Sequence, residues 1–295
     1  MATSVSGVVF GHMHEDHTTE LLLVARMPLR RAVVIASGGD LAFALAAMQV
    51  EVIAVDSNPA QIELVKLKME YAGDLTDLCF CGRVDRLLRL SGPVLSWLMD
   101  VPQLQPGSIR CFLINMGERI LRGLVSRVHG SPAAAKLDPP TIRLIRSRFE
   151  KAMRDPAAAR NPLLQVLLGR RFGGETPAVW SRQGILNWKK ETHRIYLQAG
   201  DLATVLGDLP EASVGLISVS NLPDAMSQAA WDSVVEKASQ ALAVGGYLVV
   251  RSMLCEAVYS VSDSYFMEET HLPEDASPLC PVIWVGNRKS RDSSS

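Results

Sequence analysis

The sequence lacks long hydrophobic runs and any regular arrangement of cysteines. No stretch of about 18 apolar residues occurs in the 295-residue chain, so we expect no membrane-spanning helix and no stable insertion into a membrane. The N-terminus lacks the basic and apolar regions of a signal peptide. The five cysteines are odd in number and scattered, which indicates buried thiols in a reducing, cytoplasmic compartment rather than a disulfide framework. They are Cys79, Cys81, Cys111, Cys255 and Cys280.

An excess of charge of either sign is also missing, but the charges are unevenly distributed. The net charge is −1, yet residues 106–195 carry 17 Lys and Arg against 6 Asp and Glu. Prolines interrupt the helical patterns in this part of the chain. We therefore predict a basic helical insertion over residues 76–194, within a core formed by residues 1–75 and 195–295. Its charge is explained either by docking against the acidic core or by a binding surface for an anionic substrate or lipid headgroup.

Continuous apolar runs that alternate with helical patterns predict the fold class of the core. Such runs are typical of buried parallel strands, and they lie near residues 31–39, 50–56, 212–220, 245–252 and 282–286. Helical patterns follow at residues 41–48, 59–73 and 228–242. The sequence thus predicts an α/β protein with a doubly wound, mostly parallel, Rossmann-like sheet.

The second predicted helix has marked boundaries. Asn58 is the expected N-cap, Pro59 suits the first helical position, and Gln61 stands where a capping-box partner would. Gly73 is the expected end of the helix.

Small and acidic residues at two strand ends indicate a ligand site. Ser37, Gly38 and Gly39 follow the first strand, where missing side chains would let a ligand approach the backbone. Asp56 ends the second strand, where its carboxylate is placed to accept hydrogen bonds from both hydroxyls of a ribose. A full G-x-G-x-x-G is lacking, which favours a nucleoside without a pyrophosphate over a dinucleotide. The alternative is a tight turn and a helix cap without a ligand.

Three motifs carry a resemblance to a known family. They are VVIASGGDLAFALAA (33–47), VIAVDSNPAQIELVKLK (52–68) and ISVSNLPD (217–224), the last followed by GGYLVVRS. Together they resemble the betaine-lipid synthases, which transfer a 3-amino-3-carboxypropyl group from S-adenosylmethionine to diacylglycerol on a class I methyltransferase core. The tripeptide His14-Glu15-Asp16 stands where that family has Trp-Glu-Asp, and the family's C-terminal Asp-Arg-Ser is missing. In length the chain is similar to a shorter enzyme type of the same reaction class, isonocardicin synthase of β-lactam antibiotic biosynthesis, which uses a phenol acceptor.

The resemblance implies S-adenosylmethionine as the group donor and assigns the residues that hold it. Glu15 and Asp16 would bind the ammonium of its methionyl moiety, and Gly200-Asp201-Leu202 would read the adenine edge. Ser220, Asn221 and Asp224 would face the reacting end. The implied cofactor-binding set also contains the residues of the two strand ends, namely Ser37, Gly38, Gly39, Asp56, Ser57 and Gln61.

The transfer requires a base for the proton of the acceptor hydroxyl. His17 and His14 are the first candidates, because an unperturbed imidazole titrates near neutral pH, and Asp224 is the third.

The stretch GHMHEDHTTE also contains the H-x-H-x-D-H spacing of metallo-β-lactamase-type hydrolases, through His12, His14, Asp16 and His17. That fold places the motif after several strands, whereas fewer than a dozen residues precede His12 here. A zinc pair also needs further ligands, and the pair Cys79-x-Cys81 has no second pair to complete a site. We therefore expect no metal, keep the hydrolase as a remote alternative, and note that Asp16 can instead cap a helix over residues 18–27.

The acceptor is expected to be a small molecule with a hydroxyl or phenol, and not a nucleic acid. In this interpretation the insertion is a lid over a compact cleft, with apolar surface from Trp180, Trp188 and Tyr196. Its cations would pair with a carboxylate of the acceptor, or with anionic headgroups if the acceptor is diacylglycerol. These cations are Arg143, Arg146, Lys151, Arg170 and Arg171. Ordinary methyl transfer is the further alternative, and the oligomeric state is left open.

Overall fold

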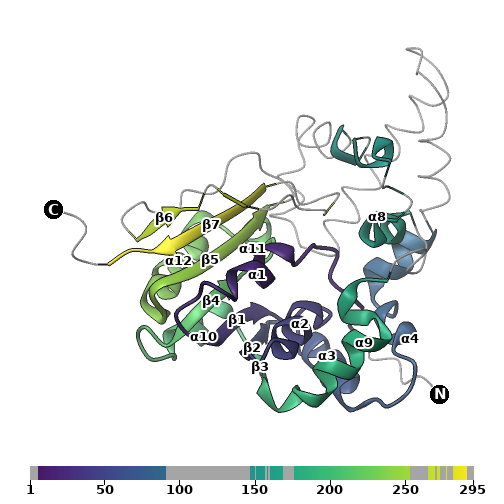
Figure 1. Cartoon of the computed structure of the whole chain (residues 1–295), viewed down its shortest axis with the longest axis horizontal. Helices are drawn as coiled ribbons and strands as arrows, with labels where there is room; N and C mark the ends of the chain where they lie inside the picture. Colours follow the sequence, from purple (N-terminus) through teal and green to yellow (C-terminus); the bar gives the residue numbers. More distant parts are fainter. Residues whose placement is uncertain are drawn as a thin grey trace.

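The fold is built on a twisted sheet, shown in Figure 1. The computed structural model describes residues 6–90, 147–149, 151–156, 158, 160–168, 176–252, 265–269, 271–272, 277 and 282–290. Within them the sheet has seven strands in the order β3-β2-β1-β4-β5-β7-β6. The strands are β1 (Arg31–Ile35), β2 (Glu51–Asp56), β3 (Ile195–Ala199), β4 (Val214–Ser218), β5 (Leu242–Ser252), β6 (Phe266–Glu268) and β7 (Val282–Arg288).

The strand directions confirm the predicted fold class. The neighbours from β3 to β5 are all parallel, whereas β7 pairs antiparallel with both β5 and β6. This is the doubly wound, mostly parallel sheet of a Rossmann-like class I methyltransferase core. β3 and β6 were not predicted. β3 is half exposed rather than continuously buried, and β6 has only 3 residues.

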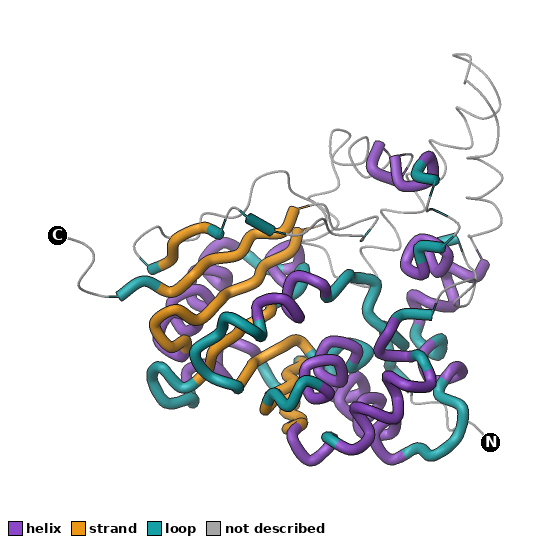
Figure 2. Tube along the Cα trace, in the orientation of Figure 1, coloured by secondary structure: helices purple, strands orange, loops and turns teal. Residues whose placement is uncertain are grey.

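Helices cover both faces of the sheet (Figure 2). Ala32 and Val34 of β1 face a core shared with α2, α3 and α9, while Val33 between them faces α10 and α12. This alternation follows from the two-residue period of a strand. The helices are α1 (Thr18–Leu23), α2 (Asp40–Ala47), α3 (Pro59–Glu70), α4 (Thr76–Cys79), α8 (Pro162–Leu167), α9 (Arg182–Lys190), α10 (Leu202–Gly207), α11 (Leu222–Ala225) and α12 (Gln228–Ala241), with 3-10 turns η1 (Ala178–Trp180) and η2 (Thr192–Arg194).

The predicted helices α2, α3 and α12 are present, and two details of α3 are corrected. Asn58 caps the helix by accepting from the Ala60 N–H at 3.0 Å, and Pro59 opens it, as predicted. Gln61 does not act as a capping-box partner, because its amide is directed to the N-terminal segment of the chain. The helix also ends at Glu70, before the predicted end at Gly73, because Tyr71 is already extended.

The end of the predicted insertion belongs to the core. Trp188 of α9 is fully buried and stacks on Phe43 of α2, with ring centroids 4.2 Å apart. Trp180 of η1 is also buried, and its ring lies edge-on to Phe43 at 5.6 Å. Residues 176–194 therefore contribute these two side chains to the core, and the predicted boundary at residue 194 stays a prediction. These two tryptophans cannot supply the surface of a lid, whereas Tyr196 is 52% exposed on β3.

Much of the rest of the insertion lies outside the described residues, including Arg143, Arg146, Arg170 and Arg171. Lys151 is described and is exposed on a helical stretch. Among the described ranges, no helix has both the length and the hydrophobicity required to cross a bilayer.

Cys79 and Cys81 are free thiols, while the other three cysteines lie outside the described residues. Burial raises the pKa of the Cys79 thiol to about 12.

Candidate functional site

The site lies at the carboxyl ends of β1 and β4, where the winding of the sheet reverses. β1 and β4 are adjacent, and the chain continues from β1 to β2 on one side and from β4 to β5 on the other. The segments that leave such a pair of strands diverge, which opens a crevice where doubly wound sheets bind their ligands.

Two serines in an unusual backbone conformation follow these two strands. Ser37 after β1 has φ 42°, and Ser220 after β4 has φ 53°. A positive φ costs a residue with a Cβ about 1–3 kcal/mol, and such residues concentrate at functional sites. Both serines were predicted as site residues, and the structure places them at neighbouring strand ends.

Asp56 lies beside the first of these turns. Its Oδ2 accepts from the Ser37 N–H at 3.2 Å and its Oδ1 from the Asn58 N–H at 2.9 Å. Burial raises the pKa of this carboxyl, while the two backbone donors oppose the shift. A carboxylate oxygen can accept more than one hydrogen bond, so both oxygens retain capacity for ribose hydroxyls. The neighbouring Ser57 is exposed.

The end of β3 lies beside the end of β2. The Gly200 N–H donates to the backbone carbonyl of Asp56 at 3.0 Å. Asp201 is the N-cap of α10, where it accepts from the Thr204 N–H at 3.0 Å, and Leu202 is buried against the sheet. The structure therefore brings the predicted ribose-binding and adenine-binding segments together.

Residues 8–17, here called the N-terminal segment, run across the glycine turn. Gln61 is buried and clamps the segment, because its Oε1 accepts from the Val9 N–H at 2.7 Å and its Nε2 donates to the carbonyl of Phe10 at 2.9 Å. Its Nε2 also donates to the carbonyl of Ser37 at 2.7 Å. The buried ammonium of Lys68 bonds the carbonyls of Gly11 and Gly38. Gln61 thus positions the segment, which is a different task from the predicted contact with a cofactor.

The glycine turn packs closely against the protein's own chain. A Cβ on Gly38 would lie 2.3 Å from the Cα of His12, and one on Gly39 would meet the ring of Phe43 at 2.6 Å. Gly39 also has φ 91°, a conformation that favours glycine. The space beside these glycines is occupied by the N-terminal segment and by α2, and the approach of a ligand to this backbone stays a prediction.

We expect Gly38→Ala to destabilise the protein by about 1–3 kcal/mol, because the backbone of His12 would have to move. Urea unfolding measures the change. Gly207→Ala is the matched control, since a Cβ there would meet only the Lys237 side chain at 3.6 Å. A Gly38→Ala variant as stable as wild type would contradict the close contact.

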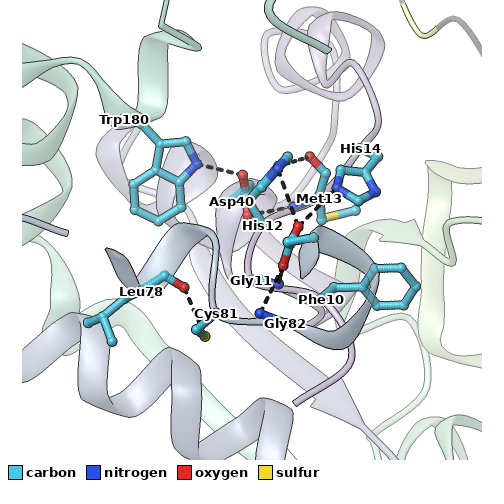
Figure 3. Close-up of polar contacts among 12 residues, drawn as sticks. Phe10, Gly11, His12, Met13, His14, Asp40, Leu78, Cys81, Gly82 and Trp180 are labelled. Carbon is cyan, nitrogen blue, oxygen red and sulfur yellow. Dashed lines mark hydrogen bonds and ion pairs between the residues drawn. The ribbon is translucent and has the colours of Figure 1, made fainter. Parts of the chain in front are cut away.

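Two aspartates fix the N-terminal segment to the core (Figure 3). Asp40 accepts from the Met13 N–H at 2.9 Å and from the indole N–H of Trp180 at 2.6 Å. Asp85 accepts from the Gly11 N–H at 2.7 Å and from the Gly82 N–H at 3.0 Å. These hydrogen bonds therefore hold the N-terminal segment along its length. They also fix the position from which the residues after Met13 continue toward the end of β4.

Glu15 reaches the end of β4 from this segment. Its Oε1 accepts from the hydroxyl of Ser220 at 2.5 Å, and its Oε2 lies 3.9 Å from Nε of Arg251. Burial raises the pKa of Glu15, and the Arg251 charge opposes the shift. Glu15 and Ser220 were each predicted as cofactor-binding residues, and the structure brings them into direct contact, which was not predicted.

Arg251 and Glu20 form a buried ion pair behind Glu15. Both guanidinium NH groups bond the Glu20 carboxylate, and the hydroxyl of Ser218 donates to it at 2.7 Å. Burial alone would raise the pKa of Glu20, but the adjacent Arg251 brings it below its usual value. This pair joins α1 to the ends of β4 and β5. It was not predicted, although an arginine directly after the apolar run of β5 was a visible signal.

The predicted bases lie in different places. His17 is half-buried and stands at the N-cap of α1, two residues after Glu15. Asp224 is buried and accepts from the hydroxyl of Ser252 at 2.8 Å, close to the end of β5. Asn221 lies beside Ser220, whose hydroxyl is 3.4 Å from its Oδ1.

The four residues of the H-x-H-x-D-H spacing do not meet at one point. Asp16 accepts from the N–H and the hydroxyl of Thr18, at 3.0 and 2.7 Å, but the N-cap of α1 is His17, so Asp16 is not the capping residue that was predicted. His14 is directed to Asp85, with its Nε2 3.3 Å from Oδ1. His12 is buried beside it, and burial lowers its pKa to about 4.

No protein-family model and no curated protein matches the sequence. Among solved structures the chain is similar to two structures of the rRNA methyltransferase aviRa from Streptomyces viridochromogenes. For each the TM-score is 0.36 and the identity 12%, over 92% of this chain and 82% of that one. The fold assignment therefore rests on the strand order and directions described above.

Proposed function

We propose that the protein is an S-adenosylmethionine-dependent transferase whose donor lies across the ends of β2, β1 and β4. The observation that carries the proposal is the position of Asp56, at the end of β2 and bonded to the strained turn at Ser37. A carboxylate at this point of a doubly wound sheet accepts from the two hydroxyls of a ribose. Asp201 and Leu202 at the end of β3 lie where the adenine would follow.

The methionyl end of the donor is assigned to the end of β4. Glu15 provides a buried carboxylate there, and an ammonium group would add a charge-assisted hydrogen bond to it. Both NH groups of Arg251 bond Glu20, whereas only its Nε lies near Glu15, at 3.9 Å from Oε2. Binding of the methionyl ammonium at Glu15 would fix the positions of the carbons attached to the sulfonium.

The reaction we favour is 3-amino-3-carboxypropyl transfer to an oxygen nucleophile. The acceptor oxygen attacks the γ-carbon, the bond from that carbon to sulfur breaks, and its electron pair stays on sulfur, which releases methylthioadenosine. The proton of the acceptor hydroxyl passes to a base, for which His17 is the best-placed candidate. Placement of the two reactants can account for about 7–11 kcal/mol of the activation barrier. The transfer itself uses no metal.

The acceptor we propose is a small molecule with a hydroxyl or phenol, with diacylglycerol as the alternative. This choice is supported by the sequence resemblance. Methyl transfer uses the same nucleoside site and is the second candidate function.

Product analysis tests the proposal. Purified protein is incubated with S-adenosylmethionine and either a soluble phenolic amino-acid derivative or diacylglycerol vesicles. We expect acceptor-dependent methylthioadenosine with the phenol. Acceptor-dependent S-adenosylhomocysteine would instead establish methyl transfer, and methylthioadenosine formed only with vesicles would establish the lipid acceptor. Absence of S-adenosylmethionine binding in calorimetry would contradict the nucleoside site itself.

A further inference from the structure

A cluster of two imidazoles and a carboxylate lies beside the glycine turn, where His12 packs against Gly38. Its members are His12 and His14 of the N-terminal segment and Asp85, which belongs to a helical stretch at residues 83–90. One potential ligand atom from each residue lies within 4.8 Å of the other two. The proposed transfer makes no use of this cluster.

We propose that His12, His14 and Asp85 bind one divalent transition-metal ion of the zinc class. Two imidazoles and one carboxylate are a common ligand set for zinc, with a fourth position left for water. The Nε2 atoms of His12 and His14 lie 3.6 and 3.3 Å from the same oxygen, Oδ1 of Asp85. Ligand atoms about 2.0–2.2 Å from a tetrahedral ion are themselves separated by about 3.3–3.5 Å.

The hydrogen bonds around the cluster orient its members for this task. Nδ1 of His12 lies 2.8 Å from the carbonyl of Met13, and a carbonyl can only accept, so the proton is on Nδ1. The lone pair of His12 is therefore on Nε2, which faces Asp85. A carbonyl that fixes the tautomer of a histidine is a frequent companion of metal ligation.

The two carboxylate oxygens of Asp85 have different partners. Oδ2 accepts from the N–H groups of Gly11 and Gly82, which anchors the carboxylate. Oδ1 is directed to the two imidazoles. The His14 side chain is 15% exposed, whereas those of His12 and Asp85 are almost fully buried. His14 is thus the ligand that can adjust its ring, and the ion would enter from its side.

This site differs from the binuclear zinc site of the sequence motif. Asp16 and His17 are not part of it, and its carboxylate comes from Asp85, 71 residues beyond His14. Cys79 and Cys81 are also outside the group. Because its histidines and its aspartate belong to different segments, the ion would cross-link the N-terminal segment to the core. Its role is therefore structural, and it holds the segment that carries Glu15.

The test uses the full chain without a histidine tag, after treatment with a chelator. Titration with Co²⁺ is followed by visible absorption, which is strong for tetrahedral sites, and Zn²⁺ is then added as competitor. We expect one equivalent of Co²⁺ to bind and to be displaced by Zn²⁺. Zn²⁺ at about 100 times its Kd should raise the Tm by about 5 °C.

Variants locate the ion. His14→Ala and Asp85→Asn should each weaken Co²⁺ binding by about 100-fold or more, since each removes a ligand. His193→Ala is the matched control, because His193 is an exposed histidine 4.0 Å from Glu191 and should leave binding unchanged. Asp85 also anchors two backbone N–H groups, so circular dichroism checks the fold of its variant, and His14, whose side chain is 15% exposed, gives the independent readout. The proposal is overturned if wild type binds no metal, or if His14→Ala binds it as wild type does.

Discussion

Asp56→Ala should weaken S-adenosylmethionine binding by at least about 100-fold. Two hydrogen bonds from ribose hydroxyls to a carboxylate contribute about 1.5–3 kcal/mol each, and alanine removes both acceptors. Asp56→Asn keeps one acceptor oxygen but loses the charge, so its loss should be smaller. Isothermal titration calorimetry measures the Kd of each variant.

An analogue of the donor separates a direct contact from a general effect on the fold. Replacing S-adenosylmethionine by its 2′-deoxy analogue should cost affinity on wild type but little further on Asp56→Ala, because the partner of that hydroxyl is already missing. Asp74→Asn is the control, since Asp74 is an exposed loop carboxylate that accepts from Thr76 at the start of α4. An unchanged Kd for Asp56→Ala would remove the basis for the nucleoside site.

The pKa of Asp56 adds a pH dependence to this prediction. Binding requires the ionised carboxylate, and burial raises the pKa of Asp56 above its ordinary value of about 3.9. Affinity for the donor should therefore begin to fall at a higher pH than an unperturbed aspartate would give. The loss should be absent in Asp56→Asn.

Much of the fold could be predicted because its strands are buried on both faces. β1, β2 and β4 appear as continuous apolar runs, the strongest strand signal of a parallel sheet. β3 at the edge of the sheet has only Ile195 buried, so no such run marks it. Strand ends follow from the runs themselves, which is why Asp56, Ser37 and Ser220 could be placed near one another without a structure.

The parts that could not be predicted depend on contacts between distant segments. Asp85 is 71 residues from His14 and Arg251 is 231 residues from Glu20, and no local pattern relates the members of either pair. Gln61 and Gly38 were predicted to bind a cofactor, and their contacts with the N-terminal segment were not foreseen. The sequence indicates that a position needs a glycine or an amide. It does not show which distant segment packs against that position, and here it is the N-terminal segment.

Trp180 and Trp188 illustrate a different error. They were predicted to provide apolar surface for a lid over a cleft, but both rings pack around Phe43 in the core. Large aromatic side chains at helical spacing bury much apolar area, and that gain decides their position. Lys189 of α9 also packs against the core. Its ammonium lies over the Trp188 ring, 5.1 Å from the centroid, and donates to backbone carbonyls at the end of α3.

Arg251→Met should destabilise the protein by about 3–5 kcal/mol, which is the largest stability effect expected for a single substitution here. The substitution leaves the carboxylate of Glu20 fully buried without its cation. The double variant Arg251→Met with Glu20→Gln should be less destabilised than Arg251→Met alone, because the charge of Glu20 is then no longer left uncompensated. Urea unfolding at neutral pH measures the free energy of unfolding of each variant.

The pH dependence of this pair has a definite sign. The folded-state pKa of Glu20 is lowered, so the pair contributes its stability above the unfolded pKa of about 4.3 and loses it as the pH falls through the folded value. The difference in stability between wild type and Arg251→Met should therefore shrink in acid. Arg194→Met is the control, since Arg194 pairs with Glu191 at 2.8 Å on the surface and its loss should cost less than about 1 kcal/mol. Equal losses for Arg251→Met and Arg194→Met would show that the buried pair does not hold α1 against the ends of β4 and β5.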